Sequence, residues 1–405
     1  MKITDVKTVL LSGPHSNDPY VQNKLRTLRS AAFIEIHTDT DLVGLGETYG
    51  GYFFPEAVPE VVEFFKPILI GRDVSNISQL WNDMYHCGNF WCRVGLGVIV
   101  LSGIEAALWD LKGKMLGVPV YELLGGRKHD KLLCYASGGG SNYPKSELAA
   151  KIDYYLSFGF KAFKLGVGSW TESEGFYVPR FPSEAADFEG DKMEFVRGHV
   201  GKDVFVMMDG HMGNHPTFTW NFSIAEAVMK AVEPYDLFFF EEPLHYTDLQ
   251  GYSQLCKRTS VPIAGGECLT GSCEWQVFAD YDAFDIGQPD GSFVGGLGVF
   301  MKVASMLENR NRKIATHNAG SGGSLMENIH CTFASPNAAI LEACAAYGPL
   351  HTEIAGDSFV MEDGMVLPPE KPGLGIVLTE KIKNKYPFVP GSGEFNDVPG
   401  KILTT

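Results

Sequence analysis

The sequence has no apolar run approaching the roughly 20 residues that cross a bilayer, and Gly, Glu or Lys interrupts its longest apolar stretches. It also lacks a charged start followed by an apolar segment, so no secretory signal is expected. Its eight cysteines include no Cys-x-x-Cys spacing, which disfavours a redox or zinc motif of that kind. We therefore expect a cytoplasmic protein with reduced cysteines and no membrane partner.

Positive charge is also scarce. Lys and Arg number 33 against 49 Asp and Glu, which gives a net charge of -16. Such a surface repels phosphate backbones, so no nucleic-acid partner is expected. Hydrophobic residues make up 45% of the 405 residues, enough to bury a large core. The composition therefore predicts a folded globular chain and excludes the disordered and fibrous classes.

From about residue 130 onward, short apolar runs alternate with helix-like segments, and most of these runs end on a polar residue. The predicted strands are 132–136, 162–165, 204–208, 237–240, 262–266, 284–288, 313–316 and 339–341. Eight βα repeats favour a closed barrel of about 250 residues over an open α/β sheet. We expect a barrel over residues 129–350, an α+β capping domain over 1–128, and a segment 351–405 that returns to the capping domain.

Carboxylates follow three consecutive predicted strands, at Asp209, Glu241 and Glu267. The strands of a barrel end at one face, so these side chains should share a pocket. Oxygen ligands without Cys or His suit Mg²⁺. An acid after a strand can instead cap a helix, but three in succession favour a metal site. Strand alternation is expected to turn the neighbouring Glu242 away from the cavity.

The next strand ends place an acid beside a histidine, at Asp290 and His317. A carboxylate that bonds to an imidazole fixes its tautomer and raises its basicity, which a general base requires. The sequence therefore predicts an Asp290–His317 catalytic pair. His211 lies two residues beyond Asp209, a spacing that can return its side chain to the same pocket. The sequence leaves two roles open for His211: a catalytic acid, or a loop histidine that forms a hydrogen bond with the backbone.

One connection is expected to be unusually long. Residues 166–189 carry several aromatic side chains and an arginine without a clear period, and exceed the usual βα connection. Barrel active sites are built from βα loops, so we predict a substrate-facing loop here.

Five segments together are specific to one group of enzymes: residues 102–114 (SGIEAALWDLKGK), 240–243 (FEEP), 265–267 (GGE), 288–290 (QPD) and 372–375 (PGLG). Through them the chain resembles the mandelate racemase subgroup of the enolase superfamily over nearly its whole length. The resemblance implies a modified TIM barrel, (β/α)₇β, under an α+β capping domain. It also implies Mg²⁺ on the three strand-end acids, a His317–Asp290 dyad, and Glu342 near the substrate carboxylate or enediolate. Relatives commonly form dimers or octamers, so a homo-oligomer is expected.

The sequence departs from this subgroup on the second predicted strand, where Lys-x-Lys is usual and Lys164-Leu165-Gly166 stands here. Lys161 cannot replace the missing lysine, because its odd spacing from Lys164 places it on the opposite strand face. Racemisation generally needs an acid and a base on opposite faces of the substrate, whereas elimination can use one base. Lys164 alone can still bind or polarise a carboxylate.

These observations predict a Mg²⁺-dependent dehydratase of a sugar acid, an aldonate or aldarate. His317 would remove the proton α to the carboxylate, and the enediolate would lose its β-hydroxyl to give a 2-keto-3-deoxy acid. Some sugar-acid dehydratases of the subgroup place a histidine at the position of His211 as the acid that releases the hydroxyl. A cycloisomerase or epimerase of the same subgroup, or a sugar-acid binding protein without activity, are the alternatives.

Overall fold

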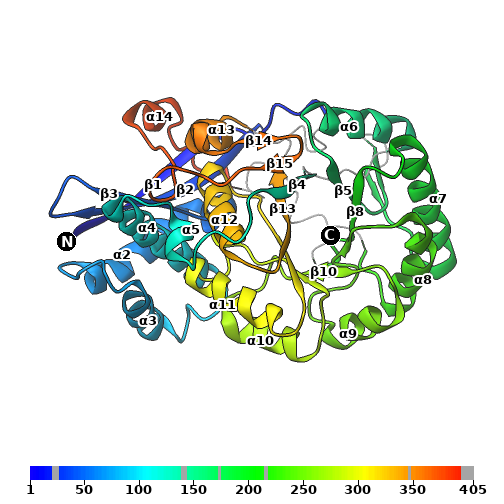
Figure 1. Ribbon diagram of the computed structural model, residues 1–405, viewed down its shortest axis with the longest axis horizontal. Coiled ribbons are helices and arrows are strands. Elements are labelled where there is room, and N and C mark those ends of the chain that lie inside the picture. The colour runs from blue at the N-terminus through cyan, green and yellow to red at the C-terminus, as the bar shows by residue number, and fades with distance from the viewer. Residues whose placement is uncertain (21–26, 138–143, 172–174, 214–217, 345–347, 394–405) are drawn as a thin grey trace.

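The computed structural model contains the 405-residue chain and describes all of it except residues 21–26, 138–143, 172–174, 214–217, 345–347 and 394–405. Two units are visible: a ring of helices around a barrel, and an antiparallel sheet backed by helices at its side (Figure 1). None of the helices in the described part of the chain combines the length and hydrophobicity that a bilayer-spanning helix needs.

The N-terminal unit is a three-stranded antiparallel sheet in the order β1-β2-β3, with helices packed against it. Its elements are β1 (Ile3–Pro14), β2 (Leu28–Thr38), β3 (Val43–Thr48), α1 (Gly50–Phe53), α2 (Val58–Leu69), α3 (Ile77–Gly88) and α4 (Leu96–Leu116). Helix α4 crosses β3 so closely that a Cβ atom on Gly46 would lie 2.3 Å from the Gly103 carbonyl oxygen. Glycine in β3 therefore permits the close packing of strand and helix.

The barrel contains eight parallel strands, and pairing of the last with the first closes it. The strands are β4 (Leu132–Ser137), β5 (Ala162–Gly166), β8 (Phe205–Asp209), β9 (Phe240–Glu241), β10 (Ile263–Gly265), β11 (Ile286–Gly287), β12 (Lys313–Thr316) and β13 (Ala338–Cys344). Each overlaps a predicted run, although β9 shares only Phe240 with its run, and the barrel prediction is confirmed. In the described part of the chain, the strands are connected by the α-helices α6 (Lys145–Ser157), α7 (Pro182–Val200), α8 (Phe222–Val232), α9 (Leu249–Arg258), α10 (Gly271–Asp280), α11 (Leu297–Glu308) and α12 (Gly322–Ala334).

The barrel interior has an apolar layer directly beneath a polar layer. The apolar layer is one buried cluster: Tyr135, Ala162, Met207, Phe239, Ala264, Ile286, Ala315 and Ile340. The polar layer consists of the residues that follow six members of this cluster by two positions in the chain: Lys164, Asp209, Glu241, Gln288, His317 and Glu342. Side chains two residues apart in a strand share a face, so the strands that fill the core also aim these polar groups into one site.

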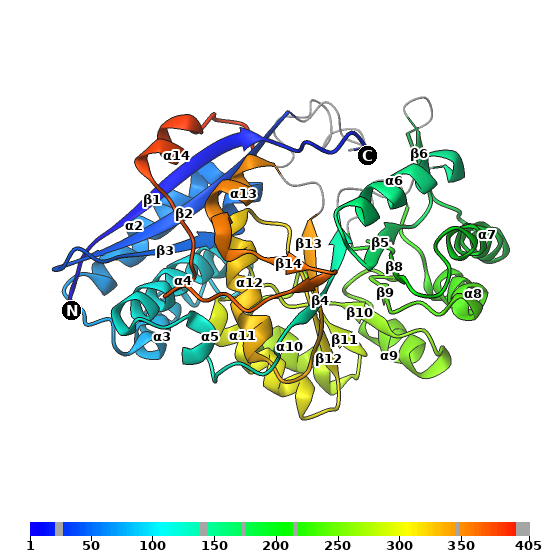
Figure 2. The same ribbon diagram turned by 45° about the horizontal axis from the view of Figure 1, so that its top comes forward.

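The C-terminal part of the described chain contacts both units. It contains α13 (Pro349–Ala355), β14 (Met361–Glu362), β15 (Met365–Val366) and α14 (Glu380–Lys385). Strand β15 pairs antiparallel with β4 of the barrel, and the amide of Ser12 in β1 donates to the Tyr386 carbonyl. Figure 2 shows α14 beside β1. Residues 394–405 of the predicted returning segment lie outside the described residues.

The connection after β5 is more ordered than the sequence suggested. Strands β6 (Ser169–Thr171) and β7 (Gly175–Tyr177) form an antiparallel hairpin, whose residues 172–174 are among those not described. Helix α7 begins at Pro182, so the expected irregular loop to residue 189 is wrong. Proline is favoured in the first turn of a helix, and Glu184 adds a favourable negative charge there.

Candidate active site

The ammonium group of Lys164 lies among three carboxylates at the carboxyl ends of the barrel strands. Its Nζ atom is 2.6 Å from Glu241 Oε2, 3.2 Å from Asp209 Oδ2 and 3.4 Å from Glu342 Oε1. Burial alone would lower the pKa of Lys164, but the three acids outweigh it and raise that pKa well above its usual value. Lys164 is therefore a buried cation among the carboxylates at the strand ends.

Glu241 is the most enclosed of these acids. It is fully buried, and its Oε1 atom has no hydrogen-bond partner among the described residues. Burial, followed by repulsion from Asp209, raises the pKa of Glu241 well above its usual value. The single positive charge of Lys164 does not balance the negative charge of the three carboxylates around it. A divalent cation that prefers oxygen ligands could bind here and balance the remaining charge.

The predicted pair of Asp290 and His317 is present. His317 Nδ1 lies 2.9 Å from Asp290 Oδ2. The other oxygen of Asp290 accepts hydrogen bonds from the Ser292 amide at 2.8 Å, the Ser292 hydroxyl at 2.7 Å and the Asn328 side chain at 3.0 Å. A carboxylate held by donors in this way makes Nδ1 the protonated nitrogen of the neutral ring, which leaves Nε2 to accept a proton.

His317 Nε2 faces the carboxylate of Glu267 at 3.4 Å. Burial by itself favours the neutral imidazole, but Glu267 and then the hydrogen bond to Asp290 outweigh it and raise the pKa of His317 to about 10. The same attraction, from His317 and then from His211, overcomes the effect of burial on Glu267 and lowers the pKa of that acid. Glu267 and His317 form the second charged centre of the pocket.

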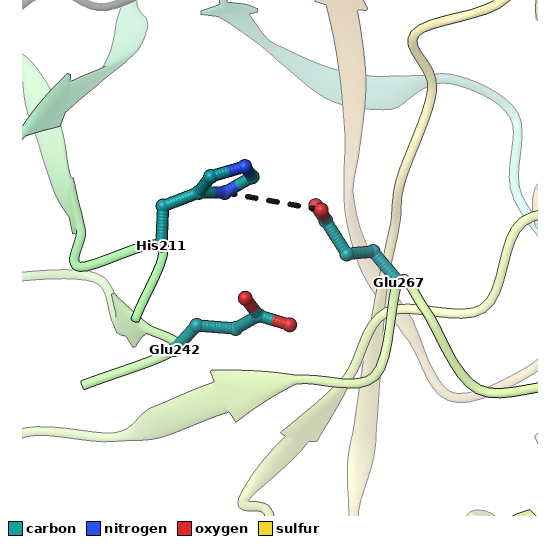
Figure 3. A group of neighbouring side chains, drawn as sticks. All are labelled: His211, Glu242 and Glu267. Carbon is teal, nitrogen blue, oxygen red and sulfur yellow. Dashed lines mark ion pairs between the residues drawn. The ribbon is translucent and has the colours of Figure 1, made fainter. Parts of the chain in front are cut away.

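His211, Glu242 and Glu267 converge from three connections (Figure 3). A ligand atom from each lies within 4.8 Å of the others. His211 Nδ1 is 3.8 Å from both Glu267 Oε1 and Asp209 Oδ1. Desolvation favours the neutral ring, but Glu267 and then Asp209 outweigh it and raise the pKa of His211. His211 therefore lies beside Glu267 and Asp209, which favour its protonated ring.

The expectation that Glu242 turns away from the cavity is wrong. Strand β9 ends at Glu241, and Glu242 adopts a φ of 38°, in the left-handed region. Strand alternation does not extend through such a residue, so its side chain turns toward His211 and Glu267 (Figure 3). Burial, followed by repulsion from Glu267, raises the pKa of Glu242 well above its usual value.

The eight predicted site residues all lie at this end of the barrel, but they form two groups. Asp209, Glu241 and Glu342 surround Lys164, whereas Glu267 faces the two histidines. Among the residues that the structure describes, the group with ligand atoms mutually within 4.8 Å is His211, Glu242 and Glu267 rather than the predicted trio of acids. Asp209 and Glu241 still stand side by side, as partners in the pairing of β8 with β9.

Two residues near the pocket were not predicted as members of the site. The Tyr49 ring, at the end of β3, lies 5.9 Å from the His317 ring in an edge-on arrangement. Gln288 is fully buried, and its amide atoms have no partner among the described residues. The two-residue spacing from Ile286 could have indicated Gln288, but no local signal connects Tyr49 to this site. Lys161 pairs with Asp363, in agreement with its predicted outward direction.

Comparison with known families matches both units. Residues 147–382 match the family described as enolase C-terminal domain-like. Residues 9–125 match the mandelate racemase / muconate lactonizing enzyme N-terminal domain.

Among characterised relatives, arabinonate dehydratase of Saccharolobus solfataricus is 30% identical over 355 residues, which cover 87% of this chain and 89% of that protein. D-galactonate dehydratase of Pectobacterium atrosepticum is 32% identical over 366 residues, covering 86% and 89%. Among solved structures, 3,6-anhydro-D-galactonate cycloisomerase of Zobellia galactanivorans has a TM-score of 0.80 and 27% identity, covering 96% of this chain and all of that one. A racemase from Streptomyces coelicolor A3(2) with bound magnesium has a TM-score of 0.79 and 26% identity, covering 95% and 99%.

Proposed function

We propose that this chain, which belongs to the mandelate racemase / muconate lactonizing enzyme family of the enolase superfamily, is a Mg²⁺-dependent dehydratase of a sugar acid. The observation that carries the proposal is the His317–Asp290 pair, whose Nε2 faces the Glu267 carboxylate. The similarity to arabinonate and galactonate dehydratases supports an aldonate or aldarate as substrate.

Asp209, Glu241 and Glu267 are the proposed Mg²⁺ ligands. They come from three consecutive strand ends, and the unpartnered, buried Oε1 of Glu241 is the kind of oxygen that a cation satisfies. A bound Mg²⁺ would supply positive charge to the substrate carboxylate and to the enediolate, and would offset the carboxylate that holds the His317 pKa high.

His317 is the proposed base. Its Nδ1 hydrogen is held by Asp290, so Nε2 is the atom that takes the proton α to the substrate carboxylate. Lys164 would bind that carboxylate as the negative charge spreads onto it. Glu342 is held by the Asn318 amide at 2.9 Å and keeps the ammonium group of Lys164 in place.

Loss of the β-hydroxyl completes the proposed reaction. The substrate loses its α-proton to His317 and its β-hydroxyl as water once that group is protonated, and the resulting enol becomes a 2-keto-3-deoxy acid. Proton exchange with solvent then restores the starting state of the acid and the base. His211 is the proposed acid that protonates the hydroxyl, because its ring lies close to Glu242 and Glu267 and its pKa is raised. His317, protonated after the first step, is the alternative source of this proton.

The test is incubation of the purified chain with MgCl₂ and a library of aldonates and aldarates, with detection of 2-keto acids. Turnover of at least one member is expected, together with its loss in a His317→Asn variant. Racemisation of some substrate without any keto acid would overturn the dehydratase proposal.

Cycloisomerisation is the second candidate, because a cycloisomerase shares this fold over its whole length. Both reactions begin with the same proton removal, but a cycloisomerase expels a ring oxygen and releases no water. NMR of the products in D₂O separates these reactions from epimerisation. Cytoplasmic location and homo-oligomeric assembly remain predictions.

A further inference from the structure

A buried carboxylate of the N-terminal unit lies at the start of barrel helix α12. Glu47, in β3, is 2% exposed. Its two oxygens accept hydrogen bonds from the Ser321 amide at 2.8 Å, the Ser321 hydroxyl at 2.7 Å and the Ser324 amide at 2.8 Å. Helix α12 follows the loop that begins directly after His317, so Glu47 fixes the far end of the loop that follows the base.

Hydrogen bonds continue from this point to the catalytic pair. The hydroxyl of Ser324 lies 2.8 Å from that of Ser292, which donates to Asp290 Oδ1 at 2.7 Å. The Ser324 hydroxyl also lies 3.3 Å from Oδ1 of Asn318, the residue after His317. Two short contacts therefore link the helix turn that Glu47 holds to the carboxylate that orients His317.

Arg29 of β2 binds the same loop through its carbonyl groups. The arginine is 4% exposed, and its Nη2 atom donates to the carbonyl oxygens of Ala319 at 2.6 Å and Gly320 at 3.1 Å. Its guanidinium group also packs on the Tyr52 ring at 4.9 Å. A loop bound through its backbone by a buried arginine and a buried glutamate has little freedom to move.

We propose that Glu47 and Arg29 are positioning residues for the His317–Asp290 pair. The N-terminal unit then does more than cover the barrel, because it sets the orientation of a base that belongs to the other unit. The expected effect on the reaction rate rests on the proposed dehydratase function. The expected effect on the orientation of the His317 ring does not depend on it.

The direct test is NMR of protein labelled with ¹⁵N-histidine, at fixed pH and MgCl₂ concentration. The His317 signals are assigned by their loss in His317→Asn. A Glu47→Gln substitution puts a donor where two backbone amides and a hydroxyl need an acceptor, so we expect the Nδ1–H resonance of His317 to shift or broaden. This readout requires no substrate, and it therefore remains valid if the proposed reaction is wrong.

Glu105→Gln is the matched control. Glu105, on α4, is likewise a buried acid of the N-terminal unit that accepts from a barrel amide, that of Gly298, at 3.1 Å. It contacts the start of α11, and no hydrogen bond of the described residues joins it to Asp290. Its substitution should leave the His317 resonance unchanged. Equal His317 spectra for wild type and Glu47→Gln would overturn the proposal, as would equal changes in the two variants.

Kinetics provide the second arm. Glu47→Gln should lower kcat by about 10- to 100-fold with a smaller effect on KM, the usual range for residues that orient a reacting group. In an Asp290→Asn background the same substitution should have little further effect, because both act through one pair. Additive losses would contradict the proposed route. If Glu47→Gln does not fold, Ser324→Ala interrupts the same route while the Ser324 amide remains.

Discussion

His317 Nδ1 lies 2.9 Å from Asp290 Oδ2, on the next strand end of the barrel, and both side chains are almost completely buried. Asp290 is fixed in turn by Ser292 and Asn328, so the imidazole cannot rotate without breaking several hydrogen bonds. The two ring nitrogens therefore have different roles. Nδ1 bonds to Asp290, and Nε2 faces Glu267.

Removal of the base should stop the first chemical step. We expect His317→Asn to lower both dehydration and exchange of the α-proton with D₂O by about 10²- to 10⁴-fold, the usual contribution of a general base. Asp290→Asn should lower both rates in parallel, because the ring loses its fixed tautomer. Parallel NMR assays of exchange and keto-acid formation measure the two rates. Undiminished exchange in His317→Asn would assign the base elsewhere.

His211 should affect the second step only. With His211→Asn we expect slow release of the hydroxyl but near-normal exchange of the α-proton, since His317 remains in place. The same two NMR assays separate these rates. Equal loss of exchange and elimination would exclude a leaving-group role and indicate that His211 instead organises the pocket.

Two neighbouring glutamates provide a matched test of the metal site. Glu241→Gln should weaken Mg²⁺ binding by at least about 100-fold, because it removes one of three charged ligands, whereas Glu242→Gln should weaken it by about tenfold or less. Isothermal titration of each folded variant with MgCl₂ gives the affinities. The reverse order would favour the observed His211, Glu242 and Glu267 group as the cation site.

Lys164→Met should destabilise the fold in the absence of divalent cations. The substitution leaves Asp209, Glu241 and Glu342 without their shared cation, and breaking a buried ion pair typically costs about 3 to 5 kcal/mol. Denaturant unfolding with and without MgCl₂ measures the loss, which Mg²⁺ should reduce. Lys161→Met is the control, because its partner Asp363 is largely exposed and the expected loss is below about 1 kcal/mol. Similar losses for the two variants would contradict the role of Lys164.

Stability should fall at acid pH partly through His330, inside α12. Burial lowers the pKa of this histidine to about 3, so it stays neutral in the folded chain while the unfolded chain takes up a proton near pH 6.5. The contribution of His330 is thus complete above pH 6.5 and declines toward pH 3, by at most about 5 kcal/mol. In His330→Asn, which keeps an acceptor for the Tyr121 amide, the free energy of unfolding should depend less steeply on pH between 6.5 and 4. An unchanged slope would show that other groups cause the acid sensitivity.

Much of the barrel was predictable because its signals are local. Each apolar run buries its own strand, and alternation at a spacing of two carries Lys164, Asp209, Glu241 and His317 onto the inner face. The pairing of Asp290 with His317 followed from the same rule, since parallel strands of a barrel end together. Local rules failed where the backbone left the strand, as at Glu242, whose positive φ reverses the direction that alternation predicts.

By itself, the sequence determined the eight-stranded barrel, the acids and histidines at its strand ends, and the family. Only the tertiary structure decided that Lys164 lies between Asp209 and Glu241, that Glu242 joins His211, and that Arg29 and Glu47 hold the loop behind His317. The physical reason is the separation along the sequence between the residues that interact. Burial and strand alternation act between residues close in sequence, whereas Glu47 and Ser321 are 274 positions apart and form their hydrogen bond only in the folded chain.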